Sequence, residues 1–340
     1  MGRGYRGAVA IAVVAGLGAG CSAPPRVASA KPVGSAIRIE TPLGLPPVTW
    51  PDENPPTAAA IALGEKLYFS KRLSADESVS CATCHDPEKG FADGARVSTG
   101  VSGRQGKRNA PTVLNAAYRR PLFWDGRAKS LEEQAAGPIQ NELEMNLKAS
   151  ELEARLTKDP ELRSWFEKAF GSQEVTLARI TAAIASYERT LISGNSAFDR
   201  YLYGGDRSAM SEAAVRGLEV FRNPEKGNCA ACHTIGRESA LFTDNQFHNV
   251  GAGMNAEGEL TDSGKEQGMF RTPTLRDVAR TAPYMHDGSL KTLKEVVDFY
   301  VGGGNSNPHL DKEIRPLTHL TRLDRADLVA FLESLNGARR

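Results

Sequence analysis

The chain has 340 residues, with 42 basic and 41 acidic side chains and a formal net charge of +1. Such a balanced charge argues against a nucleic-acid-binding or polybasic membrane-binding protein, because both carry a large basic excess. The length allows two domains of ordinary size, each able to bury its own core. Beyond the N-terminus, no apolar run approaches the roughly 20 residues that a membrane-spanning helix needs.

Residues 1–20 are predicted to be an export signal. Arg3 and Arg6 give a short basic start, and an apolar stretch of small residues follows. Ala19-Gly20-Cys21 resembles a lipoprotein cleavage site, which would leave Cys21 as a lipidated N-terminus. Ala28-Ser29-Ala30 offers an ordinary cleavage site instead. Both routes predict a periplasmic protein, and the first adds a lipid anchor at the membrane.

The segment 21–56 is rich in proline and lacks periodicity, which is typical of a tether or a wrapping arm. Beyond it, apolar residues recur at helical spacing, and no segment shows convincing strand alternation. Helices are predicted from Thr57 onward, over 152–170 with an interruption near Pro160, over 175–192, from Ser211 to Phe221 and over 325–335. The predicted fold class is therefore mainly α with long loops.

An internal repeat divides the chain into two halves. Ala110-Pro111-Thr112-Val113-Leu114 recurs as Thr272-Pro273-Thr274-Leu275. Thirteen residues beyond each proline stands Trp124-Asp125-Gly126 or His286-Asp287-Gly288, and five residues beyond each glycine a leucine opens a predicted helix. Two equal offsets between matched motifs indicate a duplicated domain, with the halves at 57–203 and 204–340.

Four of the five cysteines stand in two identical Cys-x-x-Cys-His motifs. The motifs are Cys81, Cys84 and His85, and Cys229, Cys232 and His233. This pattern attaches c-type haem, because the two thiols add to the haem vinyl groups and the histidine becomes an iron ligand. A redox pair or half a zinc site could explain one Cys-x-x-Cys, but not two copies that each continue into histidine. The sequence therefore predicts two tandem cytochrome-c-like haem domains.

The sixth ligand of each iron decides what the haem can do, because an open position reacts with small oxidants and a filled one passes electrons. Most candidate ligands follow the second motif: His248, His286, His309, His319, Met254, Met269 and Met285. Between the first motif and Asp206 there is no histidine and one methionine, Met145. The first haem therefore lacks a strong local sixth ligand and is the expected reaction centre.

Several further motifs accompany the haem sites: Arg108-Asn109-Ala110-Pro111-Thr112, Phe123-Trp124-Asp125-Gly126-Arg127, Glu133-Gln134-Ala135, Glu144-Met145 and Thr281-Ala282-Pro283-Tyr284-Met285-His286-Asp287-Gly288. Together, from about Thr57 to Leu335, the chain resembles the bacterial di-haem cytochrome c peroxidases and their MauG-type relatives. The resemblance implies that the N-terminal haem is peroxidatic and that the C-terminal haem is its electron-transfer partner.

The resemblance also assigns roles to three residues around the first haem. Gln134 and Glu144 match the distal-pocket glutamine and glutamate of the family. A carboxylate above the iron can move a proton from one peroxide oxygen to the other. Trp124 matches the aromatic residue placed between the two haems, where an oxidisable ring can relay electrons. The alternatives are a surface carboxylate for Glu144 and plain core packing for Trp124.

A calcium ion is a further implied cofactor. Asn109, Thr281 and Pro283 match the family's calcium site, where a side-chain amide oxygen and two backbone carbonyls, completed by waters, suit a hard cation. Family peroxidases are often dimers, which leaves a homodimer open for this chain.

Two departures from the usual family pattern concern the sixth ligands. Val101 stands where many family peroxidases have a histidine that caps the peroxidatic haem, so an open, high-spin first haem is expected. Tyr300 stands where conventional members place the methionine ligand of the second haem, as in MauG-type enzymes. A phenolate favours Fe(III), whereas a thioether favours Fe(II). The alternatives are Tyr300 as a plain buried aromatic and a His/Met haem through Met285.

Three functions are compatible with these residues. The favoured one is reduction of hydrogen peroxide at the His85 haem, with electrons from a small cytochrome c or a cupredoxin passing through the His233 haem. The second is MauG-like oxidation of Trp or Tyr residues of a partner protein, which Tyr300 favours. Against it, Gly227 replaces the MauG-type surface tryptophan before the second motif. The third is a pure electron carrier, which an open first haem with Glu144 above it disfavours.

Overall fold

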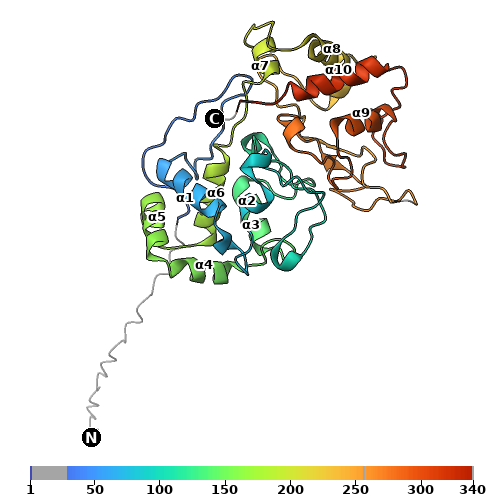
Figure 1. The fold of residues 1–340 in the computed structure, drawn as a ribbon. Coiled ribbons are helices and arrows are strands. Elements are labelled where there is room, and N and C mark those ends of the chain that lie inside the picture. Colours follow the sequence, from blue (N-terminus) through green and yellow to red (C-terminus); the bar gives the residue numbers. More distant parts are fainter. Residues whose placement is uncertain (2–28, 256, 339–340) are drawn as a thin grey trace.

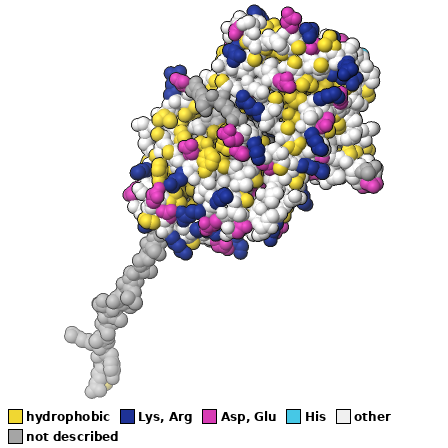
Figure 2. All heavy atoms as spheres, in the orientation of Figure 1, with side chains coloured by type: hydrophobic (Ala, Val, Ile, Leu, Met, Phe, Trp, Pro, Cys, Tyr) yellow, Lys and Arg dark blue, Asp and Glu magenta, His cyan; other side chains and the backbone are white. Residues whose placement is uncertain are grey.

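The computed structural model describes residue 1, residues 29–255 and residues 257–338. Apart from Met1, the predicted signal peptide lies outside the described residues, as does Cys21, so signal and lipid anchor stay predictions. The described chain forms two helical lobes, the first coloured blue to green and the second yellow to red (Figure 1). None of its helices is both long and apolar enough to cross a bilayer. Acidic and basic side chains are interspersed on the face shown in Figure 2.

The first lobe contains α1 (Ala58–Tyr68), α2 (Cys81–Cys84), α3 (Leu131–Gln140), α4 (Ala149–Thr157), α5 (Pro160–Phe170) and α6 (Leu177–Glu188), with short 3-10 turns at Lys71–Leu73, Pro87–Lys89, Val101–Gly103 and Ala116–Tyr118. Thr57 caps α1, since its hydroxyl accepts a hydrogen bond from the Ala60 amide (3.3 Å). Pro160 occupies the first turn of α5 and separates it from α4. The helices predicted in this half are confirmed, with α6 shorter than expected.

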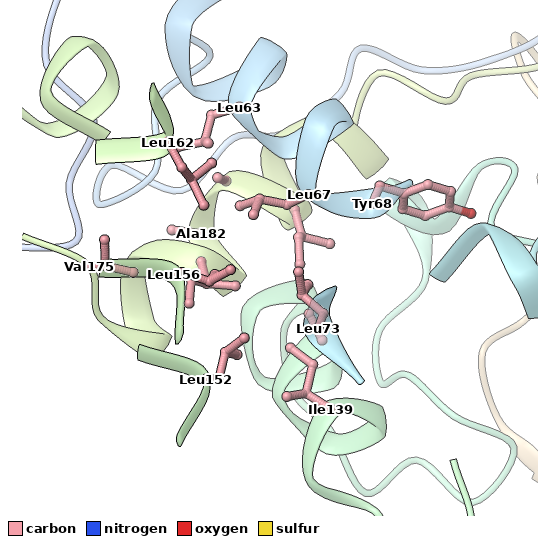
Figure 3. Close-up of a cluster of buried hydrophobic side chains, with 14 of the residues drawn as sticks. Leu63, Leu67, Tyr68, Leu73, Ile139, Leu152, Leu156, Leu162, Val175 and Ala182 are labelled. Carbon is pink, nitrogen blue, oxygen red and sulfur yellow. The ribbon is translucent and has the colours of Figure 1, made fainter. Parts of the chain in front are cut away.

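One apolar core holds the first lobe together, with α1 packed against α6 and α5. Its side chains converge from five helices and include Leu63, Leu67, Ile139, Leu152, Leu156, Leu162 and Ala182 (Figure 3). Gly64 lets α1 approach α6 closely, because any side chain there would collide with the Ala183 carbonyl. At the end of α1, the Tyr68 hydroxyl donates a hydrogen bond to the His85 carbonyl (3.0 Å). The core thus positions the first haem motif.

The second lobe contains α7 (Ala197–Leu202), α8 (Glu212–Arg222), α9 (Leu293–Val301), α10 (Arg322–Glu333), the strands β1 (Phe247–His248) and β2 (Phe270–Arg271), and 3-10 turns at Cys229–Ala231 and Val278–Arg280. Helix α7 precedes the predicted boundary at residue 204, but its Phe198 packs in the core of this lobe. Ser211 caps α8 as predicted. Helix α8 packs on α10, and Gly217 permits this because a side chain would collide with the Asp327 carbonyl. The antiparallel pair β1–β2 was not predicted, since two-residue strands are too short to show alternation.

The sequence repeat is also a repeat of backbone conformation. Landmarks recur at the same offset that separates Pro111 from Pro273: the bridges Leu122–Ala128 and Tyr284–Leu290, the left-handed residues Asn115 and Asp277, the left-handed glycines Gly126 and Gly288, and the cis prolines Pro121 and Pro283. Helices α3 and α9 then begin at equivalent positions. The two lobes therefore share one local architecture around their haem motifs.

The described part of the N-terminal arm packs against both lobes. The Val33 amide donates a hydrogen bond to a carbonyl at the end of α5 (2.9 Å). The Gly44 carbonyl accepts one from Arg276 of the second lobe (2.6 Å). The Arg276 guanidinium also pairs with Asp199 (2.9 Å), and both side chains are fully buried. The sequence suggested either a tether or a wrapping arm, and these contacts are those of a wrapping arm.

Candidate haem sites

The first Cys-x-x-Cys-His motif forms α2 and the residue that ends it. Ser80 and Thr83 make a capping box at its start. Cys81 and Cys84 are half-buried free thiols. The Nδ1–H of His85 donates to a backbone carbonyl six residues on (3.3 Å), because a carbonyl can only accept, and this leaves Nε2 available. Burial lowers the pKa of His85 and so keeps the imidazole neutral, the form that binds iron.

The second motif has the same chemistry on a different local frame. Asn228, in a left-handed conformation (φ 53°), opens a 3-10 turn in place of a helix. Cys229 and Cys232 are again half-buried free thiols. The Nδ1–H of His233 donates to the Phe242 carbonyl (2.9 Å), and burial lowers its pKa as well. Each lobe therefore presents two thiols and one neutral imidazole with a free nitrogen.

Each motif opens into its own cavity. The first, of about 930 Å³, is lined by its motif and by Gln134, Glu144 and Met145. The second, of about 270 Å³, is lined by its motif and by Met285 and Tyr300. Eight of the described residues line both cavities: Asn109, Ala110, Pro111, Thr112, Arg119, Trp124, Arg271 and His286. The two cavities thus share a wall.

Gln134 and Glu144, which the family resemblance assigns to the pocket of the first haem, line the first cavity together with His85. Ser130 caps α3, which carries Gln134. The carboxylate of Glu144 accepts a hydrogen bond from the Asn141 side-chain amide (2.7 Å). Burial nevertheless raises the pKa of Glu144, with that hydrogen bond opposing the shift. A half-buried acid of raised pKa is suited to carrying a proton.

Val101 belongs to the apolar core of the first lobe, with 2% of its surface exposed. Its amide donates a hydrogen bond to the Glu144 carbonyl (2.8 Å). The preceding Gly100 packs so tightly that a side chain would collide with the Leu143 and Glu144 carbonyls. The loop that carries Val101 is therefore fixed against the segment that carries Glu144, and Val101 is absent from the described lining of the first cavity.

Trp124 forms part of the wall shared by the cavities. Its indole N–H donates to the Asn109 carbonyl (2.9 Å), and its own carbonyl accepts from the Arg271 amide (2.9 Å). Its ring meets the His286 imidazole edge-on, with centroids 6.5 Å apart. Contacts from both lobes thus hold this indole between the two haem motifs.

In the second cavity, Tyr300 of α9 and Met285 both contribute to the lining. Burial raises the pKa of the Tyr300 hydroxyl, and the thiols of Cys229 and Cys232 add to the shift. That hydroxyl has no hydrogen-bond partner within residues 29–255 and 257–338. Its oxygen is therefore free to act as a ligand inside the cavity.

The other candidate sixth ligands are placed less favourably. His248 lines the second cavity, but its Nδ1 contacts Asp311 (2.6 Å) and its Nε2 contacts Asp244 (3.0 Å). Cys232, Asp244 and His248 could together bind a metal ion, but attachment of haem at Cys232 removes one of these ligands. In the described part of the chain, the linings of both cavities lack Met254, Met269, His309 and His319.

The residues predicted to bind calcium lie at the junction of the lobes. Asn109 is buried, and its side-chain nitrogen donates to the Ala95 carbonyl (2.9 Å), which leaves its side-chain oxygen facing elsewhere. The carbonyls of Thr281 and Pro283 accept no hydrogen bond from any described residue. Thr281 also lies near Gly90 of the first lobe, since a side chain on Gly90 would touch it. Three oxygen donors are thus available.

Some cavity-lining residues have a buried polar side-chain atom without a hydrogen-bond partner among the described residues. No sequence motif indicated these atoms. Four such atoms belong to cavity-lining residues: Arg119 Nε, Glu188 Oε2, Arg271 Nε and His286 Nε2. Buried polar groups normally have hydrogen-bond partners, so these four indicate that polar groups of a ligand belong in the cavities. Two thiols, an imidazole and such atoms in a mostly apolar cavity fit a haem, which carries vinyl, iron and carboxylate groups.

The fold and the paired sites define a c-type cytochrome with two haem centres in tandem lobes. Residues 58–207 match the di-haem cytochrome c peroxidase family, and residues 214–336 match the cytochrome c family. The chain belongs to the di-haem cytochrome c peroxidase and MauG family, and its cofactors are two c-type haems.

Named relatives include proteins of both functional kinds. The chain is 40% identical over 294 residues to the methylamine utilization protein MauG of Methylophilus methylotrophus, covering 84% of this chain and 85% of that protein. It is 38% identical over 332 residues to the cytochrome-c peroxidase IdrP1 of Denitromonas iodatirespirans, covering 87% and 86%. The crystal structure of a MauG-like protein associated with microbial copper homeostasis superposes with a TM-score of 0.78 at 33% identity, covering 89% of this chain and 96% of that one.

Proposed function

We propose that this di-haem peroxidase reduces hydrogen peroxide to water in the cavity that contains His85. The observation that carries the proposal is the joint lining of that cavity by His85, Gln134 and Glu144, while Val101 packs in the core. Each peroxide takes up two electrons and two protons and yields two water molecules. The cavity beside His85 is also the larger of the two.

The side chains of the first cavity have separate roles in this proposal. Cys81 and Cys84 would hold the haem and Nε2 of His85 would bind its iron, and the bound haem would supply the redox chemistry. Glu144 accepts a proton from the near peroxide oxygen and returns it to the far one, so that water can leave. The Gln134 amide orients the bound peroxide by hydrogen bonding.

Electrons reach the first cavity from the second lobe. Cys229 and Cys232 hold the second haem, and His233 and Tyr300 are its proposed iron ligands. Trp124, held in the shared wall, relays electrons between the two centres. A small cytochrome c or a cupredoxin in the periplasm recharges the second haem. A lipid anchor at Cys21 would keep the enzyme near membrane-bound donors, and a homodimer stays a prediction.

Calcium completes the proposed holoenzyme. The Asn109 side-chain oxygen and the Thr281 and Pro283 carbonyls supply three oxygen ligands, and waters supply the others. Support comes from the two carbonyls, which accept no hydrogen bond from the described residues. The ion would join a residue of the first lobe to two of the second.

The test is to add hydrogen peroxide to the fully oxidised protein and to record absorption spectra. An open first haem should react at once, and reduced cytochrome c should then return the spectrum to its starting form with continuous turnover. A protein that ignores peroxide until it has been pre-reduced would overturn the open site at His85.

Oxidation of a partner protein is the second candidate, and Tyr300 favours it. A phenolate ligand would hold the second haem at low potential and let both centres share oxidising equivalents. Gly227 opposes it, because a side chain at this position would approach the Val220 carbonyl to 2.7 Å and the Cys229 sulfur to 3.2 Å, so a tryptophan here would require the local backbone to shift. A peroxide-generated spectrum that lasts for minutes and is poorly quenched by reduced cytochrome c would favour this candidate.

A further inference from the structure

We propose that Arg119 and Arg271 form one cationic site in the shared wall that binds carboxylate groups of both haems. The site does not depend on the peroxidase proposal, because it concerns how the haems are held. It is defined by two buried guanidinium groups, one from each lobe, and both line both cavities.

The hydrogen bonds of the two arginines leave donors unused. Among the described residues, Arg119 donates to the backbone carbonyls of Thr112 and Leu114 and to no other group. Arg271 donates from its side chain to the Thr272 carbonyl (3.0 Å). The Nε atom of each arginine is buried and has no partner among the described residues. Exposure is 7% for Arg119 and 4% for Arg271, so bulk water does not satisfy these donors.

Neither guanidinium forms an ion pair with a carboxylate of the described residues. Burial, and for Arg119 repulsion from Arg271, lowers the pKa of Arg119 to about 9, and burial lowers that of Arg271 to about 10. Both therefore stay protonated at neutral pH. Glu188 is the acid that interacts with Arg119, but burial raises the pKa of its carboxyl to about 8, which makes it largely neutral. Two buried cations without an anion are costly, and a bound anion removes that cost.

Two other buried arginines of this chain are each neutralised by a carboxylate. Arg276 is paired with Asp199, and Arg189 is paired with Glu132 (2.7 Å). Arg119 and Arg271 have no such carboxylate in the described chain. Each haem would bring carboxylate side chains, and the two cavities that contain the attachment cysteines are the ones that both arginines line. Guanidinium groups bind carboxylates through two parallel hydrogen bonds.

The repeat supplies an independent observation. At the offset that relates the lobes, Arg119 is equivalent to Thr281 and Arg271 is equivalent to Asn109. Thr281 and Asn109 are residues of the proposed calcium site. The junction thus has its arginine pair at the positions that mirror two residues of the proposed calcium site.

Reduction potentials of the two haems test the site. In Arg119→Gln and Arg271→Gln, both potentials should fall, because a nearby positive charge favours the reduced haem. Arg119→Lys and Arg271→Lys, which keep the charge, should stay close to the parent values. Arg108→Gln is the matched control: Arg108 lines the first cavity and is already paired with Asp125 (2.6 Å) and Asp262 (2.6 Å), so the second haem should not respond. Unchanged potentials in the Gln variants, or a shift of only one haem, would overturn the shared site.

A second measurement tests the same site if a Gln variant fails to fold with both haems attached. Haem labelled with ¹³C in its carboxylates gives infrared bands that report their hydrogen bonding in the holoenzyme. The lysine variants retain the charge but lose the two-pronged geometry, so the labelled bands should shift in both of them. Bands identical to those of the parent protein in both lysine variants would overturn the proposal.

Discussion

The indole N–H of Trp124 donates a hydrogen bond to the backbone carbonyl of Asn109 over 2.9 Å. The Asn109 amide in turn donates to the His286 carbonyl over 2.7 Å. The same residue therefore holds the proposed electron relay through its carbonyl, reaches the second lobe through its amide and offers its side-chain oxygen to the proposed calcium ion. Loss of that ion is therefore expected to disturb the position of the Trp124 indole, because Asn109 contacts both.

Removal of calcium should slow peroxide turnover. Chelation would release Asn109 from Thr281 and Pro283, and the Trp124 indole would lose its fixed position between the haems. Turnover should fall after treatment with a calcium chelator and return on addition of Ca²⁺. Mg²⁺ should not restore it, because it requires a smaller and stricter octahedral site. Full activity in protein shown by metal analysis to be calcium-free would contradict this.

Glu144→Gln should lower turnover by roughly 10²- to 10⁴-fold, the usual contribution of a positioned acid–base group. Because the pKa of Glu144 is raised, the acidic limb of the parent pH profile should lie above the range of an ordinary glutamate and vanish in the variant. Glu142→Gln is the control, since that side chain is exposed and absent from the described cavity lining. Equal rates for the two variants would remove Glu144 from the reaction.

Tyr300→Met should raise the reduction potential of the second haem, because a thioether stabilises Fe(II) more than a phenolate does. Tyr284→Phe is a matched control in the same cavity: the Tyr284 hydroxyl is already bonded to the Val278 carbonyl (3.1 Å). Potentials would be measured by following the haem spectrum during reductive titration. If Tyr300→Met leaves the potential unchanged, Tyr300 is not a ligand.

Glu188 should make stability depend on pH. Its pKa is raised from 4.5 to about 8 by burial, so the folded state holds a proton that the unfolded state releases. The bound proton stabilises the folded state fully below pH 4.5. This stabilisation is lost as the pH rises to about 8, by at most about 1.4 kcal/mol per pH unit. Glu188→Gln should therefore become more stable relative to the parent across that window, as measured by denaturation midpoints. Parallel pH profiles would contradict a neutral buried acid.

Asp199→Ala should destabilise the protein by about 3–5 kcal/mol, because it leaves the buried Arg276 cation without its partner. Glu161→Ala provides the comparison, since its pair with Lys66 is exposed and such pairs contribute roughly 0–1 kcal/mol. Urea denaturation of the two variants measures the difference. Similar midpoints would show that the Gly44 carbonyl and other contacts suffice for Arg276.

Much of the fold follows from local sequence signals. Thr57, Ser211 and Pro160 mark helix boundaries through capping and fixed φ, which act within one turn and are legible in a single chain. The repeat could also be detected from the sequence, because two pairs of matched motifs are separated by equal numbers of residues. The cysteine motifs define the haem sites for the same reason, since covalent chemistry requires adjacent residues.

What the sequence did not reveal depends on contacts between distant segments. Arg119 and Arg271 carry no motif that marks them, and only the folded chain places both in one wall. The engagement of His248 by Asp244 and Asp311 removes a ligand candidate that composition alone could not exclude. The strands β1 and β2 exist through pairing across a loop, which has no signal at a length of two residues each.

The path of the arm bears on how the protein can be divided. Gly44 lies before the first haem motif, yet its carbonyl solvates the Arg276 guanidinium in the second lobe, which Asp199 then neutralises. An evolutionary fusion of two monohaem cytochromes would have begun as two self-sufficient units. In the present chain the second lobe uses a carbonyl of the arm inside its own interior, so a second lobe expressed without the arm would lack one of the hydrogen bonds to the buried Arg276 guanidinium.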